Sequence, residues 1–180
     1  MESRLLRVKL VFVSLVTLLS VGVVHAATPA DCPASTVASN KALAERWVHD
    51  VLQESVNDID ILDGILAEDY LHNAGFNQPL VEGRDAYKAY VTGFFIGGSF
   101  TDQEVVADQV VATKDRAVAS WTIDAVYQEG QGGTVAAGTP VSWSGMTMMR
   151  FECGMVAESW TEADSLSRLQ QIGAVPSETP

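Results

Sequence analysis

Residues 141–163 read VSWSGMTMMRFECGMVAESWTEA, and this stretch decides the fold class. Apolar and polar residues alternate on both sides of Cys153-Gly154, which is the period of two β-strands joined by a tight turn. The alternation predicts strands over residues 141–151 and 155–163 that pair as an antiparallel hairpin.

The register of this hairpin decides which side chains share a face. If the turn is a two- or four-residue loop, Thr147 pairs with Trp160 and Trp143 pairs with Asp164. One face would then carry tryptophans together with the carboxylates of Glu158 and Asp164. A three-residue loop would shift the register by one and separate these residues.

The rest of the chain extends the hairpin into an α+β domain. Apolar spacing predicts a helix from Asn40 to about residue 53, a second from Asn57 to about Leu66, and a third from about Gly83 to Gly97. Alternation predicts strands over 105–112 and 116–128, and a short helix follows over 166–172. Helices first and hairpin-linked strands second indicate helices packed on a mostly antiparallel sheet.

The first 26 residues have the pattern of an export signal. Basic residues precede an apolar run over 10–24, and Val24-His25-Ala26 resembles a cleavage site. We therefore expect a signal peptide over 1–26, an arm over 27–39, one domain over 40–173 and a tail over 174–180. The product would be periplasmic or secreted, with no membrane contact after cleavage.

Charge and cysteine content limit the partners. The chain has a net charge of −12 and no cluster of basic residues, so nucleic acid is excluded as a partner. Cys32 and Cys153 survive cleavage, and an exported protein meets an oxidising compartment, which favours a disulfide between them. Two unrelated thiols are the alternative, because the sequence does not fix their separation.

Three residues are candidates for acid/base chemistry. Asp164, at the end of a strand, could have its pKa raised by apolar surroundings, or it could simply cap the helix that follows. An exposed Asp164 carboxylate would argue against the catalytic role. His72 could act from a loop over a pocket or bond to nearby backbone, and Glu158 could serve the site or an ion pair.

Aromatic residues are candidates for the pocket wall. We expect ligand contacts from Tyr70, Phe94, Trp121, Trp143 and Trp160, with Glu158 beside them. The sequence contains no Cys/His metal cluster, no P-loop and no G-x-S-x-G motif, so neither a metal nor a cofactor is expected.

The order of several segments resembles the SnoaL-like polyketide cyclase family. The segments are Leu66 to Asn73, Glu82 to Ala86, Met149 to Trp160, and Asp164 followed by Leu169 to Gly173. The resemblance implies an NTF2-like α+β cone around an apolar pocket, commonly in a dimer. It also implies an aspartate, matched by Asp164, as acid/base without metal or cofactor, and a histidine matched by His72.

Two functions follow from this reading, and both use the same pocket. One is an acid/base enzyme of cyclase, isomerase or hydrolase type that acts on a small apolar carbonyl compound. The other is an exported protein that binds a small hydrophobic molecule without chemistry. Polyketide ring closure normally occurs in the cytoplasm, so predicted export argues against a literal cyclase. Met146 and Met148, on the outer sheet face, suggest a homodimer.

Overall fold

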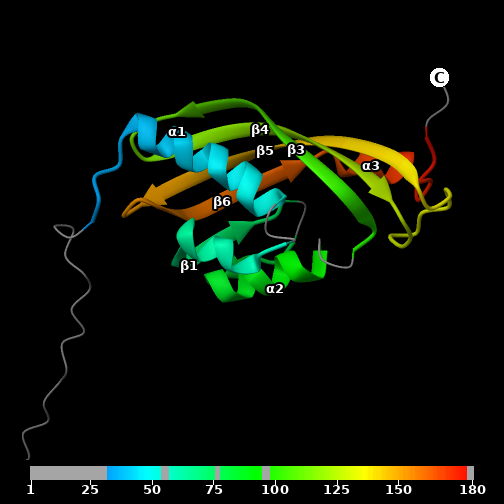
Figure 1. Ribbon diagram of the computed structural model, residues 1–180, viewed down its shortest axis with the longest axis horizontal. Coiled ribbons are helices and arrows are strands. Elements are labelled where there is room, and N and C mark those ends of the chain that lie inside the picture. The colour runs from blue at the N-terminus through cyan, green and yellow to red at the C-terminus, as the bar shows by residue number, and fades with distance from the viewer. Residues whose placement is uncertain (1–31, 54–56, 76–77, 95–97, 178–180) are drawn as a thin grey trace, which may run out of the picture. The chain divides into compact units, whose positions relative to one another are not determined.

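The computed structural model describes residues 32–53, 57–75, 78–94 and 98–177 (Figure 1). The predicted signal segment lies outside this part of the chain. The helices are α1 (Val37–Arg46), a π-helical segment (Trp47–Val51), a 3-10 segment (Ile59–Gly64), α2 (Arg84–Phe94) and α3 (Ser165–Gln171). The strands are β1 (Leu66–Asn73), β2 (Val81–Glu82), β3 (Phe100–Ala112), β4 (Arg116–Tyr127), β5 (Thr139–Glu152) and β6 (Met155–Ala163).

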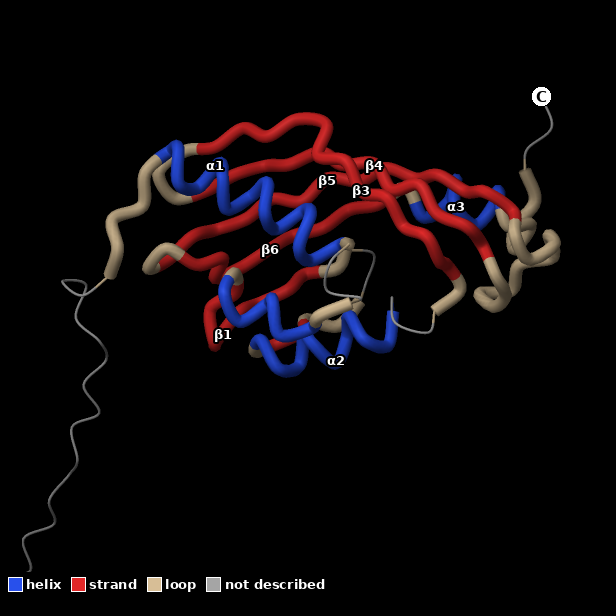
Figure 2. Tube along the Cα trace, in the orientation of Figure 1, coloured by secondary structure: helices blue, strands red, loops and turns tan. Residues whose placement is uncertain are grey.

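The six described strands form one sheet in the order β2-β1-β6-β5-β4-β3 (Figure 2). All neighbours pair antiparallel except β1 and β6, which are parallel. The α+β prediction is confirmed. The expected helix through Leu66 is wrong, because Leu66 begins β1, and His72 lies within this strand instead of a loop.

The helices close over one face of the sheet. α1 packs on β3 and β4, α2 on β1, and α3 on β5. Ala44 of α1 and Trp47 and Val51 of the π-helical segment are fully buried, as the apolar spacing of the predicted helix over 40–53 indicates. They meet Trp121 and Ile123 from the inner face of β4 in a single core. A concave sheet face covered by helices at its edges leaves room for a cavity.

The hairpin of β5 and β6 contains a bulge that the sequence analysis did not foresee. Next to the turn Phe151 pairs with Val156, which is the register of the predicted pairs, but the following pair is Arg150 with Glu158. Ala157 is therefore an extra residue on β6, and every later pair is shifted by one. The predicted pairs of Thr147 with Trp160 and of Trp143 with Asp164 are wrong for this reason.

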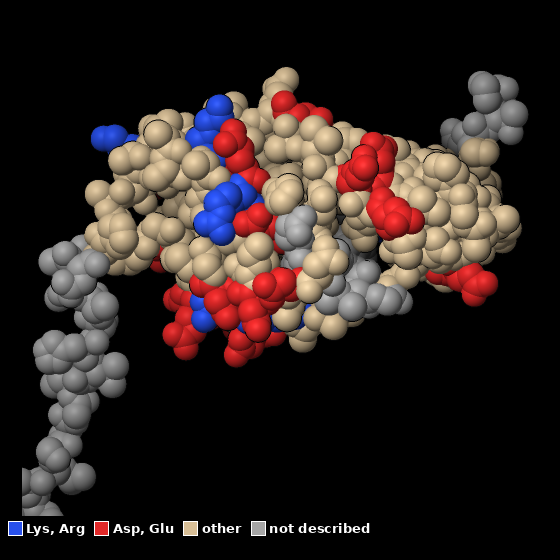
Figure 3. All heavy atoms as spheres, viewed as in Figure 1, with Lys and Arg blue, Asp and Glu red and all other residues tan. Residues whose placement is uncertain are grey.

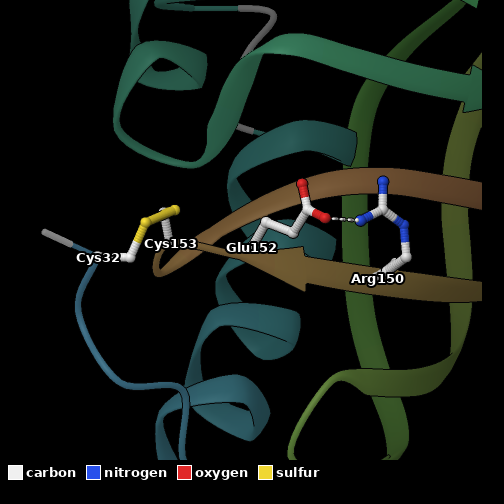
Figure 4. The surroundings of a disulfide bond; sticks show 4 residues. All are labelled: Cys32, Arg150, Glu152 and Cys153. Carbon is white, nitrogen blue, oxygen red and sulfur yellow. Dashed lines mark ion pairs between the residues drawn. A yellow bond between two sulfur atoms is a disulfide. The ribbon is translucent and has the colours of Figure 1, made fainter. Parts of the chain in front are cut away.

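The turn of this hairpin is joined to the N-terminal arm by a disulfide, which confirms that prediction. Cys32 and Cys153 are bonded with their Cα atoms 4.5 Å apart, across 121 positions of sequence (Figure 4). Beside the bond, Arg150 and Glu152 form an ion pair of 2.7 Å. Closing a loop of this length stabilises the folded chain by on the order of 4 kcal/mol in the chain-entropy model.

Among the charged side chains on the face shown in Figure 3, acidic ones predominate. They gather over the 3-10 segment and the start of α2, where Asp60 and Asp63 pair with Lys88 at 2.9 and 2.8 Å. The Lys88 partner holds the pKa of Asp63 below its usual value. Among the described helices, none is long and apolar enough to cross a membrane.

Candidate active site

A cavity of about 280 Å³ lies between the helices and the inner face of the sheet. Five aromatic side chains line it, and a few polar groups stand among them, which is the usual make-up of a small-molecule site. The lining residues are Trp47, Leu52, His72, Ala74, Gln78, Tyr87, Tyr90, Trp121, Ile123, Trp143, Thr161, Ala163, Ser165 and Arg168.

His72 projects from β1 into this cavity. Because β1 and β6 are parallel neighbours, His72 lies opposite Ser159, and its Nδ1 is 2.9 Å from the Ser159 hydroxyl. Ser159 in turn shares a short hydrogen bond with the hydroxyl of Tyr70. Only 3% of His72 is exposed, and burial lowers the pKa of its imidazole to about 4. His72 is therefore neutral at pH 7, and a ligand would meet its Nε2 atom.

Tyrosine rings from α2 enclose this histidine. The ring centroids of Tyr87 and Tyr90 lie 4.7 and 5.4 Å from that of His72. Tyr87 and Tyr90 are three residues apart, so one face of the helix presents both. Burial raises the pKa of each phenol, which keeps both hydroxyls protonated at neutral pH.

Trp121 forms the opposite wall and is held in one position. Its Nε1 donates to the Thr147 hydroxyl at 3.1 Å, and Thr147 also bonds with Thr161. Gly145 is its cross-strand neighbour, and a Cβ atom at position 145 would lie 2.3 Å from Cζ2 of Trp121. The indole can lie against the sheet only because residue 145 has no side chain.

Asp164 lies outside the cavity. It is exposed, and its Oδ1 accepts a 2.9 Å hydrogen bond from the backbone N–H of Ser167. The capping alternative is therefore confirmed. Because α3 starts at this cap, Arg168 lies one turn further on and lines the cavity with 9% of its surface exposed. Asp164 therefore caps α3 and does not line the cavity.

The bulge places two expected ligand contacts on the outer face of the sheet. Glu158 accepts a 3.1 Å hydrogen bond from Nε of Arg150. Trp160 lies under the guanidinium of Arg116, 5.6 Å from its ring centroid. Neither residue lines the cavity, which corrects the expected pocket wall.

Of the other residues expected to contact the ligand, two line the cavity and one is buried beneath its wall. Trp121 and Trp143 line the cavity. Tyr70 is fully buried below His72 and reaches it through Ser159. Phe94 ends α2, and its side chain lies outside the described part of the structure.

Sequence reasoning missed most of the lining residues, and Trp47 and Arg168 show why. Trp47 belongs to the apolar face of the first helix, where a core residue and a pocket residue have the same spacing. Arg168 follows Leu166 and Ser167 on a short helix, where an arginine is ordinarily exposed to solvent. No local pattern distinguishes either residue from its ordinary counterpart.

These features define an NTF2-like α+β cone with a pocket on its concave side. Residues 42–172 match the model of the SnoaL-like polyketide cyclase family, which is most of the chain. The chain belongs to the SnoaL-like polyketide cyclase family. No curated protein matches it.

Three solved structures illustrate the likeness. TsrD from Streptomyces laurentii is 26% identical with a TM-score of 0.62, and the match covers 77% of this chain and 97% of TsrD. AclR from Streptomyces galilaeus, provisionally described as a hydroxylase, is 25% identical at a TM-score of 0.64, over 81% and 87% of the two chains. A protein from Jannaschia sp. CCS1, provisionally described as a SnoaL-like polyketide cyclase, is 21% identical with a TM-score of 0.64. The match covers 80% of this chain and 96% of the Jannaschia protein.

Proposed function

We propose that this protein is an acid/base enzyme that moves a proton on a small, largely apolar carbonyl compound, without a cofactor. One observation carries the proposal: a buried, neutral histidine lies in an aromatic cavity with its Nδ1 atom bonded to Ser159. A base must stand in its unprotonated form next to the substrate, and the lowered pKa of His72 keeps it so at neutral pH.

The hydrogen-bond chain behind His72 suits it to the role of base. When Nδ1 carries the imidazole proton, it donates to Ser159 Oγ, and the Ser159 hydroxyl can donate to Tyr70. Nε2 then presents its lone pair to the cavity and can take a proton from a carbon beside a carbonyl. Because burial disfavours the imidazolium, the proton returns readily to the product, as isomerisation or ring closure requires.

The cavity volume limits the substrate. At about 280 Å³ it is just below the roughly 300 to 1,000 Å³ of typical ligand sites. A compound with one or two rings fits this space. The indoles of Trp121 and Trp143 offer flat apolar surfaces to such rings.

Proton exchange in D₂O tests the enzyme directly. We expect the wild-type protein to speed the exchange of the methyl protons of 2-acetylnaphthalene, followed by ¹H NMR. His72→Asn should lower that rate by about 100-fold or more, since a positioned base contributes 10² to 10⁴. Asp164→Asn should leave it near the wild-type value, because Asn caps a helix as well as Asp.

A non-catalytic binding protein is the second candidate, and the lining of the cavity favours it. Among the described residues, no carboxylate lines the cavity, so an acid partner for His72 would have to come from a tyrosine or the ligand. If 2-acetylnaphthalene binds and its exchange stays at the buffer rate for all three proteins, the enzyme proposal is wrong and this candidate stands.

We further propose that the protein is exported, to the periplasm or medium. The charge and apolar pattern of residues 1–26 supports this, and so does the Cys32–Cys153 disulfide, since such bonds persist in oxidising compartments. N-terminal sequencing of the extracellular or periplasmic fraction should begin at Ala27. Intact chain confined to the cytoplasm would contradict export.

The homodimer stays a prediction. Val106, Val111 and Met146 are large apolar residues exposed on the sheet, and covering them in a second copy would remove apolar surface from water. Light scattering of the purified protein should give twice the mass of one chain. A monomer mass at high protein concentration would refute the dimer.

A further inference from the structure

Arg168 is a cation built into the wall of the cavity. It belongs to α3, and 9% of its surface is exposed. Burial lowers the pKa of its guanidinium, yet a guanidinium keeps its proton at neutral pH. A permanent positive charge therefore borders a space that is otherwise mostly aromatic.

Two aromatic rings hold the guanidinium in place. Its central carbon lies 5.4 Å from the ring centroid of Trp143 and 5.6 Å from that of Phe100. Such contacts orient the guanidinium without using its N–H donors, because the ring faces attract the cation electrostatically. The side chain is thus pre-organised, and its guanidinium loses little freedom when a ligand binds.

The electrostatic balance of the cavity is positive although the chain is strongly acidic. Among the described lining residues Arg168 carries a charge, His72 is neutral, and no carboxylate is present. The net charge of −12 acts from a distance and is screened within about 8 Å at physiological salt. Arg168 is at the cavity wall and poorly solvated, so its local field outweighs that of the surface carboxylates.

We propose that the compound held in this cavity carries a carboxylate, or an equivalent planar anionic oxygen group, which binds the guanidinium of Arg168 while its rings lie among the tryptophans. This inference rests on the proposed function for the pocket and narrows its substrate to an anionic aromatic or unsaturated compound. Arginine suits this task because its planar fork matches both oxygens of a carboxylate. Burying the anion also offsets the cost of holding a cation away from water.

A pair of near-isosteric probes tests the charge. 2-Naphthoate carries a carboxylate where 2-acetylnaphthalene carries an uncharged acetyl group, and the two are otherwise alike. Equilibrium dialysis measures the affinity of the protein for each. We expect wild-type protein to bind 2-naphthoate at least about tenfold more tightly, as a charged hydrogen-bonded pair provides. In Arg168→Met the ratio of the two affinities should fall to about one, because only 2-naphthoate carries the charge that the guanidinium attracts.

Arg116→Met is the matched control. Arg116 also lies over a tryptophan, at 5.6 Å from the Trp160 ring, but outside the cavity. Its replacement removes the same charge and a similar cation–π contact, so it should preserve the naphthoate preference. If Arg168→Met fails to fold, Arg168→Lys keeps the charge without the fork and should retain a reduced preference.

Four outcomes overturn the inference. Equal wild-type affinities for the two probes would refute the anionic substrate while leaving the pocket proposal intact. A preference that survives in Arg168→Met, or that is lost equally in Arg116→Met, would show that Arg168 is not its source. If neither probe binds, the proposed function fails together with this inference.

Discussion

Two faces of the same strands carry different kinds of side chain. On β6, Ser159 and Thr161 lie on the inner face of the sheet and take part in hydrogen bonds that hold His72 and Trp121. Between them, Trp160 points outward, and it contacts an arginine at the surface. The alternation of the strand separates the two sets, and the extra residue at the bulge decides which residues belong to each. The inner face tolerates few changes because its atoms are close-packed, whereas the outer face exchanges contacts with water at little cost.

The largest expected difference between the faces is in acid stability. The folded-state pKa of His72 is about 4, whereas an unfolded histidine titrates near 6.5, so only the unfolded chain takes up this proton between those values. The contribution of His72 is present above pH 6.5 and is lost as the pH falls to 4. It amounts to about 3 kcal/mol.

Denaturant unfolding at pH 7 and pH 4 measures this contribution. The free energy of unfolding of His72→Asn should fall about 3 kcal/mol less than that of the wild type over this interval. An identical pH dependence in His72→Asn and wild type would mean that His72 is solvated.

The second expected difference is in the stability effect of replacing a glycine by alanine. Gly145→Ala on the inner face would push a methyl group into Trp121, and overpacking of this kind costs about 2 kcal/mol. Gly93 lies in α2 with open space around it, so Gly93→Ala should instead stabilise the chain by about 0.5 kcal/mol. Thermal melts of both variants should shift in opposite directions. Equal shifts would contradict the tight contact between Gly145 and Trp121.

The local sequence pattern predicts where the strands lie, but it does not predict which side chains lie on each face of the sheet. Alternation locates β5 and β6 almost to the residue, and the pairing of Phe151 with Val156 follows from the turn. Ala157 resembles any other strand residue, so nothing local marks the bulge that moves Trp160 outward. β1 is missed for a related reason: it is a strand through its parallel pairing with β6, some 90 positions later in the sequence. The role of Arg168 likewise depends on packing between distant segments.

A smaller effect separates the capping role of Asp164 from a catalytic one. Asp164→Ala should lower the free energy of unfolding by about 1 kcal/mol, the usual cost of losing an N-cap. Asp164→Asn should restore most of it, because the amide oxygen accepts the same bond from Ser167. A loss of proton exchange in Asp164→Asn with normal stability would instead return the carboxylate to the reaction.

The smallest expected effect is on the outer face. Glu158→Gln removes the charge that pairs with Arg150, yet both side chains remain partly exposed, at 19% and 26%. Water and salt screen such a pair, so the loss should be about 0.5 kcal/mol and should shrink further in 1 M NaCl. Urea unfolding at low and high salt measures it. Because Glu158 faces away from the cavity, its removal should leave the binding of 2-acetylnaphthalene unchanged; weaker binding would mean that the outer face communicates with the pocket through β6.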